Sequence, residues 1–330
     1  MLLTLASRKQ RWTSPFKQLL LNSYIFNHFY STTSNDITES QPSQSTPPPI
    51  QVLLTESTGR GVFATRKIGS GELIHTAQPF VCHPYFSSLH TVCYFCLKKL
   101  ANGDNSGVNF CGDSCRKQAM GFCEVENQAD WSAFDTHCRY EITRGLKYPL
   151  LVRRLACMVL SGVASSNSLD ILQPAILSPQ MIALMEEEFG LLRCALLDAD
   201  LTGEKMAFLT KQWYIGVLAR IRINAFRIEL VGGSYEDLLL SASSSVNAEA
   251  AVGSAIYMLP SFYNHDCDPN VHILWIENVN ARVKALRDIE EGEELRICYI
   301  DASMNYKARQ TLLSEGFGFQ CHCLRCLSYD

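Results

Sequence analysis

Residues 264–270 read NHDCDPN, and six of these seven residues are polar or proline. The segment stands between the apolar run AIYMLPSFY and the strand-like VHILWIE. Unpaired polar groups are costly in an apolar environment, so a polar loop between buried segments needs partners of its own. We interpret the loop as one wall of a ligand pocket whose cysteine, Cys267, also binds a metal ion.

The partners of that cysteine are predicted at the end of the chain. CHCLRC supplies Cys321, Cys323 and Cys326 within six residues. A structural zinc site is tetrahedral and needs four ligands, so one ligand must come from elsewhere in the fold. Cys267 is the best candidate, and His322 is a poorer one because adjacent side chains would have to point the same way. The alternative is a set of ungrouped free cysteines.

A second zinc site is predicted from the spacing of four more cysteines, in CYFC and CGDSC: Cys93, Cys96, Cys111 and Cys115. Four thiolates close a structural site without outside help, and the alternative is buried, reduced cysteines. Three further residues show no evident partners and stay unassigned: Cys123, His137 and Cys138. The remaining four cysteines lie in apolar contexts and are expected in the core: Cys82, Cys157, Cys194 and Cys298.

Composition excludes several classes of protein. The 330 residues are 47% hydrophobic and 19% charged, which favours a chain that mostly folds. A net charge of −4 argues against binding nucleic acid through a broad basic surface. No stretch approaches the roughly 18 apolar residues of a membrane span. Several of the fourteen cysteines are grouped at metal-ligand spacings and nothing resembles a secretory leader, which together indicate a reducing compartment.

The N-terminus differs from the rest of the chain. Residues 1–35 contain four Lys or Arg residues and no acidic residue, since the first is Asp36. This profile is typical of a mitochondrial or plastid transit peptide, and the alternative is an ordinary disordered tail. Residues 36–49 include ESQPSQSTPPP and are predicted to be a flexible linker, so the folded part is expected to begin near Ile50.

The pattern beyond the linker predicts an α+β fold. Short strands with Gly-containing turns open it, and helices are expected from about residue 131 to 225, among them 148–163, 178–199 and 204–223. A loop is predicted at 238–255. Strands are then expected at 271–277, 281–287 and 294–300, followed by a helix at 303–314. The opening strands need partners, and the C-terminal strands are the most economical source, so we predict one β-rich domain interrupted by an insertion.

Four stretches in this order resemble one family: GRGVFA, NHDCDPN, GEELRICYID and FGFQCHCLRC. Together they look like the SET domain of protein lysine methyltransferases with its post-SET zinc cluster. The inserted cysteine module and helices resemble the SET-and-MYND subfamily, and the layout is similar to plant trithorax-related SET proteins. The resemblance covers about residues 50–330.

The resemblance implies a domain organisation and a threaded core. It divides the chain into a SET N-terminal part (50–92), a MYND-like zinc module (93–123), a helical insertion (124–225), a catalytic core (226–314) and a post-SET cluster (315–330). It places NHDCDPN and GEELRICYID so that one threads beneath the other as a pseudoknot. Two departures stand out. The module lacks its second ligand pair, which predicts one zinc ion there, and no helical-repeat domain precedes the end at Asp330.

The implied cofactor is S-adenosylmethionine, and the resemblance assigns residues to it: Gly59, Arg60, Gly61, Asn224, Ser261, Asn264, His265, Tyr299 and Phe319. The two glycines let the backbone approach the ligand, and Arg60 faces the methionine carboxylate. Asn264 and His265 bind the amino acid and adenine parts, the latter mainly through its backbone. Structural alternatives exist for each, such as a solvated turn charge for Arg60 and a helix-end cap for Asn224.

Tyr299 is the predicted catalytic residue. Methyl transfer from a sulfonium to an amine needs alignment and a neutral amine more than a strong base, and a phenol can orient both groups. Phe226 and Phe317 match positions that line the lysine channel. The subfamily often has Tyr where this chain has Phe317, and the missing hydroxyl is expected either to change the number of methyl groups added or to reduce activity. Asp266 replaces the commoner serine and is expected to be tolerated as a polar turn residue.

The leading hypothesis is therefore a protein-lysine N-methyltransferase that depends on S-adenosylmethionine and two zinc ions and acts on a histone-tail lysine. We expect a monomer that binds neither nucleic acid nor membrane directly. The alternatives are a zinc-containing SET-like scaffold without catalysis and a methyltransferase of an organellar protein. The resemblance indicates the nucleus, whereas the N-terminus indicates an organelle.

Overall fold

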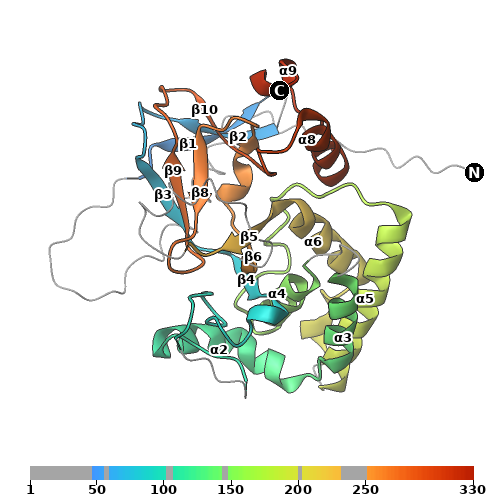
Figure 1. The fold of residues 1–330 in the computed structure, drawn as a ribbon. Coiled ribbons are helices and arrows are strands. Elements are labelled where there is room, and N and C mark those ends of the chain that lie inside the picture. The colour runs from blue at the N-terminus through green and yellow to red at the C-terminus, as the bar shows by residue number, and fades with distance from the viewer. Residues whose placement is uncertain (1–46, 56–58, 102–106, 143–147, 200–202, 232–250) are drawn as a thin grey trace, which may run out of the picture.

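The fold is seen in a computed structural model that describes residues 47–55, 59–101, 107–142, 148–199, 203–231 and 251–330. Three small sheets lie toward one side and most of the helices toward the other, which confirms the predicted α+β class (Figure 1). The predicted transit peptide and nearly all of the linker lie outside the described residues. None of the described helices has both the length and the apolar content that a membrane crossing requires.

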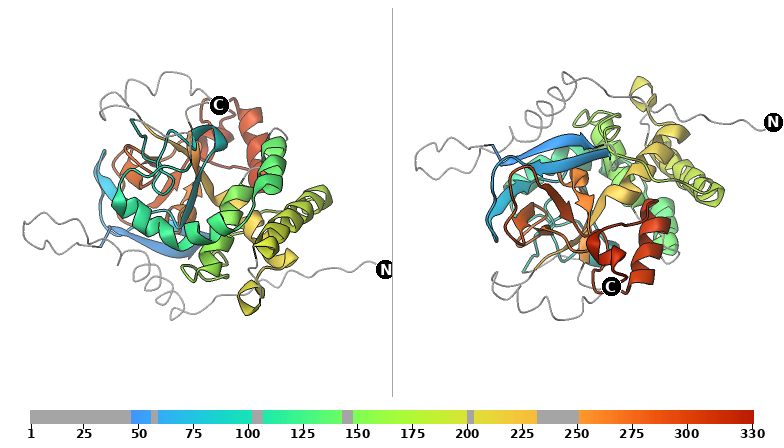
Figure 2. Two further views of the ribbon diagram at one scale, coloured as in Figure 1. Left: turned by 90° about the horizontal axis from the view of Figure 1, so that it is seen from below. Right: turned by 90° about the horizontal axis from the view of Figure 1, so that it is seen from above.

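The first sheet joins the two ends of the folded chain. Its order is β1 (Ile50–Thr55), β2 (Gly59–Ala64), β10 (Glu294–Ile297) and β7 (Asn264–His265). Strand β10 is antiparallel to β2 and parallel to β7. Figures 1 and 2 show these N-terminal and C-terminal strands side by side. The prediction that the opening strands pair with C-terminal strands is confirmed, and the first two residues of the polar loop form a strand themselves.

The second sheet repeats this pairing of chain ends. Strand β9 (Ala281–Ala285) lies between β3 (Leu73–Ala77) and β8 (Val271–Leu274). Alternate residues of β9 are buried, because one face packs on the core and the other faces outward. The strands predicted at 271–277, 281–287 and 294–300 therefore exist, each shorter at its C-terminal end than the sequence pattern indicated.

The third sheet corrects a prediction. Its order is β4 (Val81–Pro84), β6 (Ala251–Ile256) and β5 (Ala225–Glu229), so residues 251–255 are a central strand and not part of a loop. All six residues of β6 are buried. The strand consists largely of Ala, Gly and Ser, which predict strands poorly. These small residues are needed here because neighbouring parts of the chain pack closely against the strand. A Cβ at Gly253 would lie 2.5 Å from the backbone oxygen of His83.

The described α-helices between β4 and β5 are α2 (Asp113–Gln128), α3 (Ser132–Ile142), α4 (Pro149–Leu160), α5 (Pro179–Asp198) and α6 (Lys211–Asn224). Helix α2 lies before residue 131, where helices were expected to begin, and mostly within the predicted zinc module. The helices predicted at 148–163 and 178–199 are confirmed as α4 and α5. The one predicted at 204–223 is wrong in its first part, since a 3₁₀ turn (Glu204–Met206) precedes α6. Thr210 accepts a hydrogen bond from the Trp213 amide and begins α6 as its N-cap.

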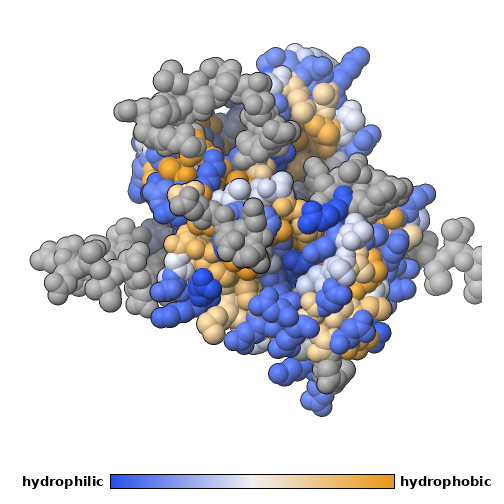
Figure 3. All heavy atoms as spheres, turned by 60° about the horizontal axis from the view of Figure 1, so that its bottom comes forward, coloured by the Kyte–Doolittle hydropathy of each residue, from blue (hydrophilic) through white to orange (hydrophobic). Residues whose placement is uncertain are grey.

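The surface of the insertion is mixed in character. On the face that Figure 3 presents, apolar side chains form patches between polar ones.

The prediction that four cysteines lie in the core is wrong for one of them. Cys194 on α5 is exposed, whereas Cys82 and Cys157 are buried and Cys298 is half-buried. Helix α5 turns one side to solvent, and its apolar pattern does not distinguish that side.

The C-terminal segment returns to the first sheet. Helix α8 (Tyr306–Leu312) continues as a π-helical turn (Leu313–Phe317), and a short helix α9 (Leu324–Leu327) follows. Gly318 ends the turn with φ of +81°, a conformation that glycine adopts without strain. Leu313 and Cys267 belong to one buried cluster, so the chain end packs against the polar loop.

Candidate active site and cysteine clusters

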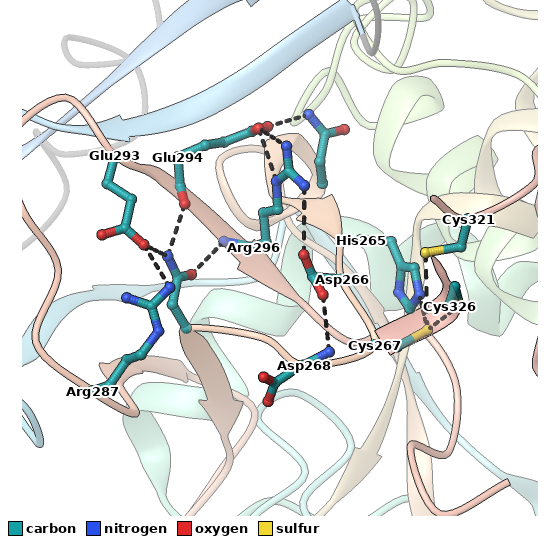
Figure 4. Close-up of polar contacts among 12 residues, drawn as sticks. His265, Asp266, Cys267, Asp268, Arg287, Glu293, Glu294, Arg296, Cys321 and Cys326 are labelled. Carbon is teal, nitrogen blue, oxygen red and sulfur yellow. Dashed lines mark hydrogen bonds and ion pairs between the residues drawn. The ribbon is translucent and has the colours of Figure 1, made fainter. Parts of the chain in front are cut away.

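Strand β10 assembles the site by lying between two of the predicted motifs. Glu294 of β10 pairs with Phe63 of β2, while Arg296 and Ile297 pair with Asn264 and His265 of β7. GRG and NHDCDPN are 203 residues apart in sequence, yet a single strand separates them in the sheet. The structure thus brings the first three motifs to one place, as the close-up of the second and third illustrates (Figure 4).

The two glycines of GRG have different structural reasons. Gly59 has φ of +76°, which favours glycine. At Gly61 a Cβ would lie 2.6 Å from Glu294 Oε1 and 3.1 Å from Asn264 Nδ2. Glycine is therefore needed at position 61 because neighbouring side chains of the site leave no room for a Cβ. The sequence alone had suggested instead that the glycine makes room for the ligand.

Arg60, between these glycines, is largely buried. Its guanidinium carbon lies 4.7 Å from the centre of the Phe262 ring, and burial lowers the pKa of the guanidinium. Within the described part of the chain it forms no ion pair with a carboxylate. A desolvated cation of this kind gains from an anionic partner, so Arg60 fits the carboxylate of the implied cofactor.

Asn264 is fixed by two hydrogen bonds. Its Nδ2 donates to the backbone oxygen of Arg60 (3.0 Å) and to Glu294 Oε1 (2.7 Å). Arg296 in turn forms ion pairs with Glu294 (2.6 Å) and with Asp266 (3.5 Å) (Figure 4). An ionised carboxylate can only accept hydrogen bonds, so Glu294 bonds to the amide nitrogen of Asn264 and not to its oxygen. The network therefore fixes the orientation of the Asn264 amide group.

Tyr299 lies two residues after the end of β10 and is held at both its backbone and its hydroxyl. Its backbone N–H donates to His265 Nδ1 (3.1 Å), and its hydroxyl donates to the backbone oxygen of Tyr263 (2.6 Å). Burial raises the pKa of the phenol, so it stays protonated at neutral pH. Burial also lowers the pKa of His265 to about 4, which keeps the imidazole neutral.

Aromatic rings from the chain end surround Tyr299. The Phe317 ring lies 5.1 Å and the Phe319 ring 6.4 Å from that of Tyr299, centre to centre. Phe319 also lies 6.0 Å from the His265 ring and is 36% exposed, which suits an aromatic that covers a bound ring. The two predicted residues Phe317 and Phe319 are thus beside the predicted catalytic residue.

Three other predicted residues make contacts of their own within the fold. Phe226 packs its ring on Tyr257 (5.5 Å) and Trp275 (6.2 Å), and the described ring contacts do not join it to Tyr299. Ser261 donates to the backbone oxygen of Tyr257 (2.6 Å). Asn224, at the end of α6, donates to the backbone oxygens of Arg220 and Gln173, as the helix-end alternative requires.

The four cysteines of the predicted C-terminal site come together. The sulfurs of Cys267, Cys321, Cys323 and Cys326 lie within 4.8 Å of one another, and all four residues are buried. Cys267 Sγ is 3.9 Å from Cys321 Sγ and 3.5 Å from Cys326 Sγ (Figure 4). Four thiolates around a tetrahedral zinc ion at 2.3 Å lie about 3.8 Å apart, so the cluster fits zinc.

The second predicted set also comes together. The sulfurs of Cys93, Cys96, Cys111 and Cys115 lie within 4.8 Å, with Cys96 to Cys111 at 3.6 Å and Cys111 to Cys115 at 3.4 Å. Cys115 lies on α2, within the stretch 93–123 for which no helix was predicted. The three unassigned residues join no such group within the described chain, and His137 instead lies 3.8 Å from Glu187.

Sequence reasoning missed the residues that hold the predicted ones in place. Glu294 and Arg296 alternate along β10 and therefore share a face, which was a usable signal. Asp266 pairs with Arg296 and also accepts from the Asp268 amide (2.9 Å), so it does more than occupy a turn. The backbone oxygen of Tyr263 that receives the Tyr299 hydroxyl left no signal in the sequence.

Comparisons with known proteins agree with this geometry. A sequence profile described as SET domain matches residues 59–300. The Arabidopsis thaliana protein named histone-lysine N-methyltransferase ATXR4 is 61% identical over 288 residues, which are 86% of this chain and 88% of that protein. A SET and MYND domain-containing protein of Dictyostelium discoideum is 23% identical over 279 residues, 79% of each chain. Human histone-lysine N-methyltransferase SMYD3 is 26% identical over 290 residues, 85% of this chain and 62% of that protein.

The profile begins at β2 and ends just after Tyr299, so it spans the three motifs that β10 joins. The similarity to the Dictyostelium discoideum protein and to human SMYD3 also extends across the cysteine module and the helical insertion. This chain therefore belongs to the SET-domain family.

Proposed function

We propose that this protein is an S-adenosylmethionine-dependent protein-lysine N-methyltransferase. Membership of the SET-domain family and the high identity to a protein named histone-lysine N-methyltransferase support the reaction class. The observation that carries the proposal is the position of Tyr299. Its side chain is held beside the Asn264–His265 strand, under aromatic rings from the chain end.

The residues around Tyr299 fit the cofactor. When bound, S-adenosylmethionine supplies an activated methyl group on its sulfonium. Arg60 would pair with the carboxylate, since its desolvated guanidinium has no carboxylate partner among the described residues. Asn264 would bind the amino acid part, His265 would contribute backbone groups, and Phe319 would cover the adenine with its half-exposed ring. Asn224 and Ser261 are kept as further contacts, with weaker support because both side chains already bond to the backbone.

Tyr299 would orient the lysine amine and would not deprotonate it. Its one hydroxyl hydrogen is given to the Tyr263 backbone oxygen, so the phenol oxygen is left as an acceptor. Its raised pKa excludes a phenolate base near neutral pH. The amine must therefore arrive neutral or lose its proton to water, and Tyr299 lowers the barrier by alignment, which can supply several kcal/mol, about 7–11 at most. Phe317 would form a wall beside the amine.

Histone lysine is the proposed substrate class, with the nucleus as the site of action. This choice depends on the names of two relatives, at 61% and 26% identity. Zinc ions in the two four-cysteine clusters would be structural, because each cluster already offers four thiolates and leaves no open position. A methyltransferase of an organellar protein, or a scaffold without catalysis, are the other outcomes of the test.

The test uses the full chain, purified with zinc, and S-adenosylmethionine carrying a labelled methyl group. Purified histones and a whole-protein extract are offered as separate substrates, and labelled lysine is identified by mass spectrometry. We expect label on lysine. Transfer to an extract protein but not to histones would move the substrate to another protein, and cofactor binding without any transfer would favour the scaffold.

Tyr299→Phe tests the catalytic role of the hydroxyl, with Tyr329→Phe as its control. Removal of the hydroxyl should lower kcat about 100-fold or more through lost alignment, while the cofactor Kd stays close to that of the wild type. Tyr329→Phe changes a tyrosine that is 75% exposed and should leave kcat unchanged. Full activity in Tyr299→Phe would refute the role given to this residue.

A further inference from the structure

The side chain of His265 makes two contacts that the proposed reaction does not require. Its Nδ1 lies 3.1 Å from the backbone nitrogen of Tyr299, and its Nε2 lies 3.2 Å from Cys267 Sγ. The ring is 8% exposed and lies 5.2 Å from the Tyr299 ring. Figure 4 shows the imidazole pointing at the cysteine cluster from strand β7. His265 was expected to act through its backbone, yet its side chain lies between Tyr299 and the predicted metal site.

The direction of both hydrogen bonds follows from the donors available. A backbone N–H can only donate, so His265 Nδ1 must be the acceptor and carries no hydrogen. In a neutral imidazole the hydrogen is then on Nε2, which faces Cys267 Sγ. A metal-bound cysteine is a thiolate, and its sulfur is an acceptor. The pair is therefore an N–H···S bond from His265 to a ligand of the C-terminal metal site.

We propose that His265 is a positioning residue that couples the C-terminal metal site to Tyr299. This inference rests on the proposed function for its catalytic consequence. When Cys267 is a metal-bound thiolate, the Nε2–H bond fixes the plane of the ring, and the ring in turn fixes the amide of Tyr299. Outer hydrogen bonds to a metal ligand hold that ligand in place, so the coupling acts in both directions.

Arg309 supports the same sulfur cluster without reaching Tyr299. Its guanidinium is fully buried, lies 3.9 Å from Cys326 Sγ and donates to the backbone oxygens of Met304 and Asp330. Arg309 therefore neutralises thiolate charge from the side of α8. Among the described residues His265 is the side chain that hydrogen-bonds both a cluster sulfur and Tyr299, which is why the coupling is assigned to it.

Two substitutions separate the two bonds of His265. Asparagine places an oxygen near the position of Nδ1 and does not reach Cys267, whereas glutamine places an NH₂ near the position of Nε2 and loses the acceptor for Tyr299. His265→Asn should lower the zinc affinity of the C-terminal site about 10- to 100-fold, the usual effect of losing an outer partner of a metal ligand, and should therefore release zinc faster than the wild type. His265→Gln should retain zinc closer to the wild type but lose kcat.

Zinc release is followed with a chromogenic chelator, and the Cys93 cluster in the same molecule is an internal reference. His272→Asn is the matched control, because His272 on β8 forms no hydrogen bond or ring contact with the cysteines or with Tyr299 among the described residues, and the charge that acts on it is that of Lys284. Thermal melting of each variant shows whether it folds. A wild-type rate of zinc release in a folded His265→Asn protein would overturn the proposal.

The coupling itself is read from the Tyr299 amide in protein labelled with ¹⁵N-tyrosine, with the peak assigned by its loss in Tyr299→Phe. Replacing zinc by cadmium should shift this peak in the wild type and leave it in place in His265→Asn. If the Tyr299 amide peak of folded His265→Asn still shifts when cadmium replaces zinc, the proposal is overturned. Neither readout needs a substrate. If both results appear while the wild type transfers no methyl group, the coupling stands and the proposed function fails.

Discussion

Arg60 carries a charge whose partner is absent from the described chain, which makes it a direct test of the cofactor site. Arg60→Met should weaken binding of S-adenosylmethionine at least about tenfold, because a hydrogen bond to a charged group contributes about 1.5–3 kcal/mol. The affinity of Arg60→Lys for S-adenosylmethionine should lie between those of the wild type and Arg60→Met, since lysine keeps the charge but not the planar guanidinium. Calorimetry measures Kd. Arg66→Met, at an exposed arginine paired with Glu72, is the control, and equal affinity in Arg60→Met would remove Arg60 from the site.

Phe317 bears on how many methyl groups are added. Its ring lies 5.1 Å from that of Tyr299, so we expect a hydroxyl added to this ring to lie near the substrate amine. Phe317→Tyr should shift the products toward lower methylation states, because the new hydroxyl takes up space and hydrogen-bonds the amine. Mass spectrometry of the substrate lysine over a time course checks this. Phe319→Tyr is the matched control on the cofactor side, and an identical product ratio in Phe317→Tyr would contradict the assignment.

His75 predicts a pH dependence of stability. It is buried, its Nε2 lies 2.8 Å from the Tyr263 hydroxyl, and burial lowers its pKa to about 4. Below about pH 6.5 the unfolded chain binds a proton that the folded chain excludes, so stability falls as pH drops toward 4, by at most about 1.4 kcal/mol per pH unit. Above pH 7 this contribution is constant.

The measurement is the denaturation midpoint of wild type and His75→Gln between pH 7 and pH 4.5. Glutamine keeps a nitrogen near the Tyr263 hydroxyl and does not titrate, so the variant should lose stability less steeply on acidification. Loss of zinc from the cysteines acts on both proteins and cancels in the difference. Parallel curves would show that His75 takes up its proton in the folded state as readily as in the unfolded state.

At the scale of elements, the cysteine module (93–123) is joined to the helices by a buried ionic network. Arg154 of α4 pairs with Glu126 of α2 (3.3 Å) and donates to the backbone oxygens of Cys82 and Tyr94. Its guanidinium carbon also lies 4.0 Å from the centre of the Tyr94 ring. Tyr94 stands between Cys93 and Cys96, so the same arginine contacts the module, β4 and α2.

Arg154→Met should therefore destabilise the protein by about 3–5 kcal/mol, because it leaves Glu126 buried without its cation. Adding Glu126→Gln should recover part of the loss, since the unpaired charge is removed. Urea denaturation of the zinc-loaded proteins measures both. Lys67→Met, at an exposed pair with Glu290, should leave the midpoint unchanged. A double variant as unstable as the sum of the two single ones would argue against a direct pair.

Elements were predictable where one residue pattern had one explanation. Helices α4 and α5 follow apolar spacing and begin with proline, and β9 alternates between buried and exposed residues. Strand β6 was not predictable, because a central strand buried on both faces shows no alternation, and Ala, Gly and Ser resemble a loop. The break before α6 was also hidden, since 204–210 contains apolar residues at helical spacing and the capping Thr210 is decisive only in context.

For the whole molecule, the pairing of chain ends and both cysteine clusters followed from the sequence, because four metal ligands must meet wherever they lie in the chain. The supporting contacts did not follow. The ion pairs of Glu294 and Arg296, the donor His265 Nε2 and the carbonyl of Tyr263 depend on a register between β10 and β7 that no spacing specifies. The parallel pairing of residues 264–265 with 296–297 creates those contacts all at once.

The two cysteine clusters are expected to differ in their effect on catalysis, which is a prediction about the whole molecule. The C-terminal cluster packs with Tyr299 and Phe317, whereas the Cys93 cluster adjoins α2, well away from β10 in Figure 1. Cys326→Ser and Cys96→Ser should each lower the zinc content from two ions to one per chain by metal analysis. Only Cys326→Ser should abolish cofactor binding and methyl transfer, because it releases the segment that carries Phe317 and Phe319. Cys96→Ser should lower the melting temperature of the module and keep the cofactor Kd. Equal loss of activity in both variants would mean that the module, too, supports the site, through the Arg154 network and β4.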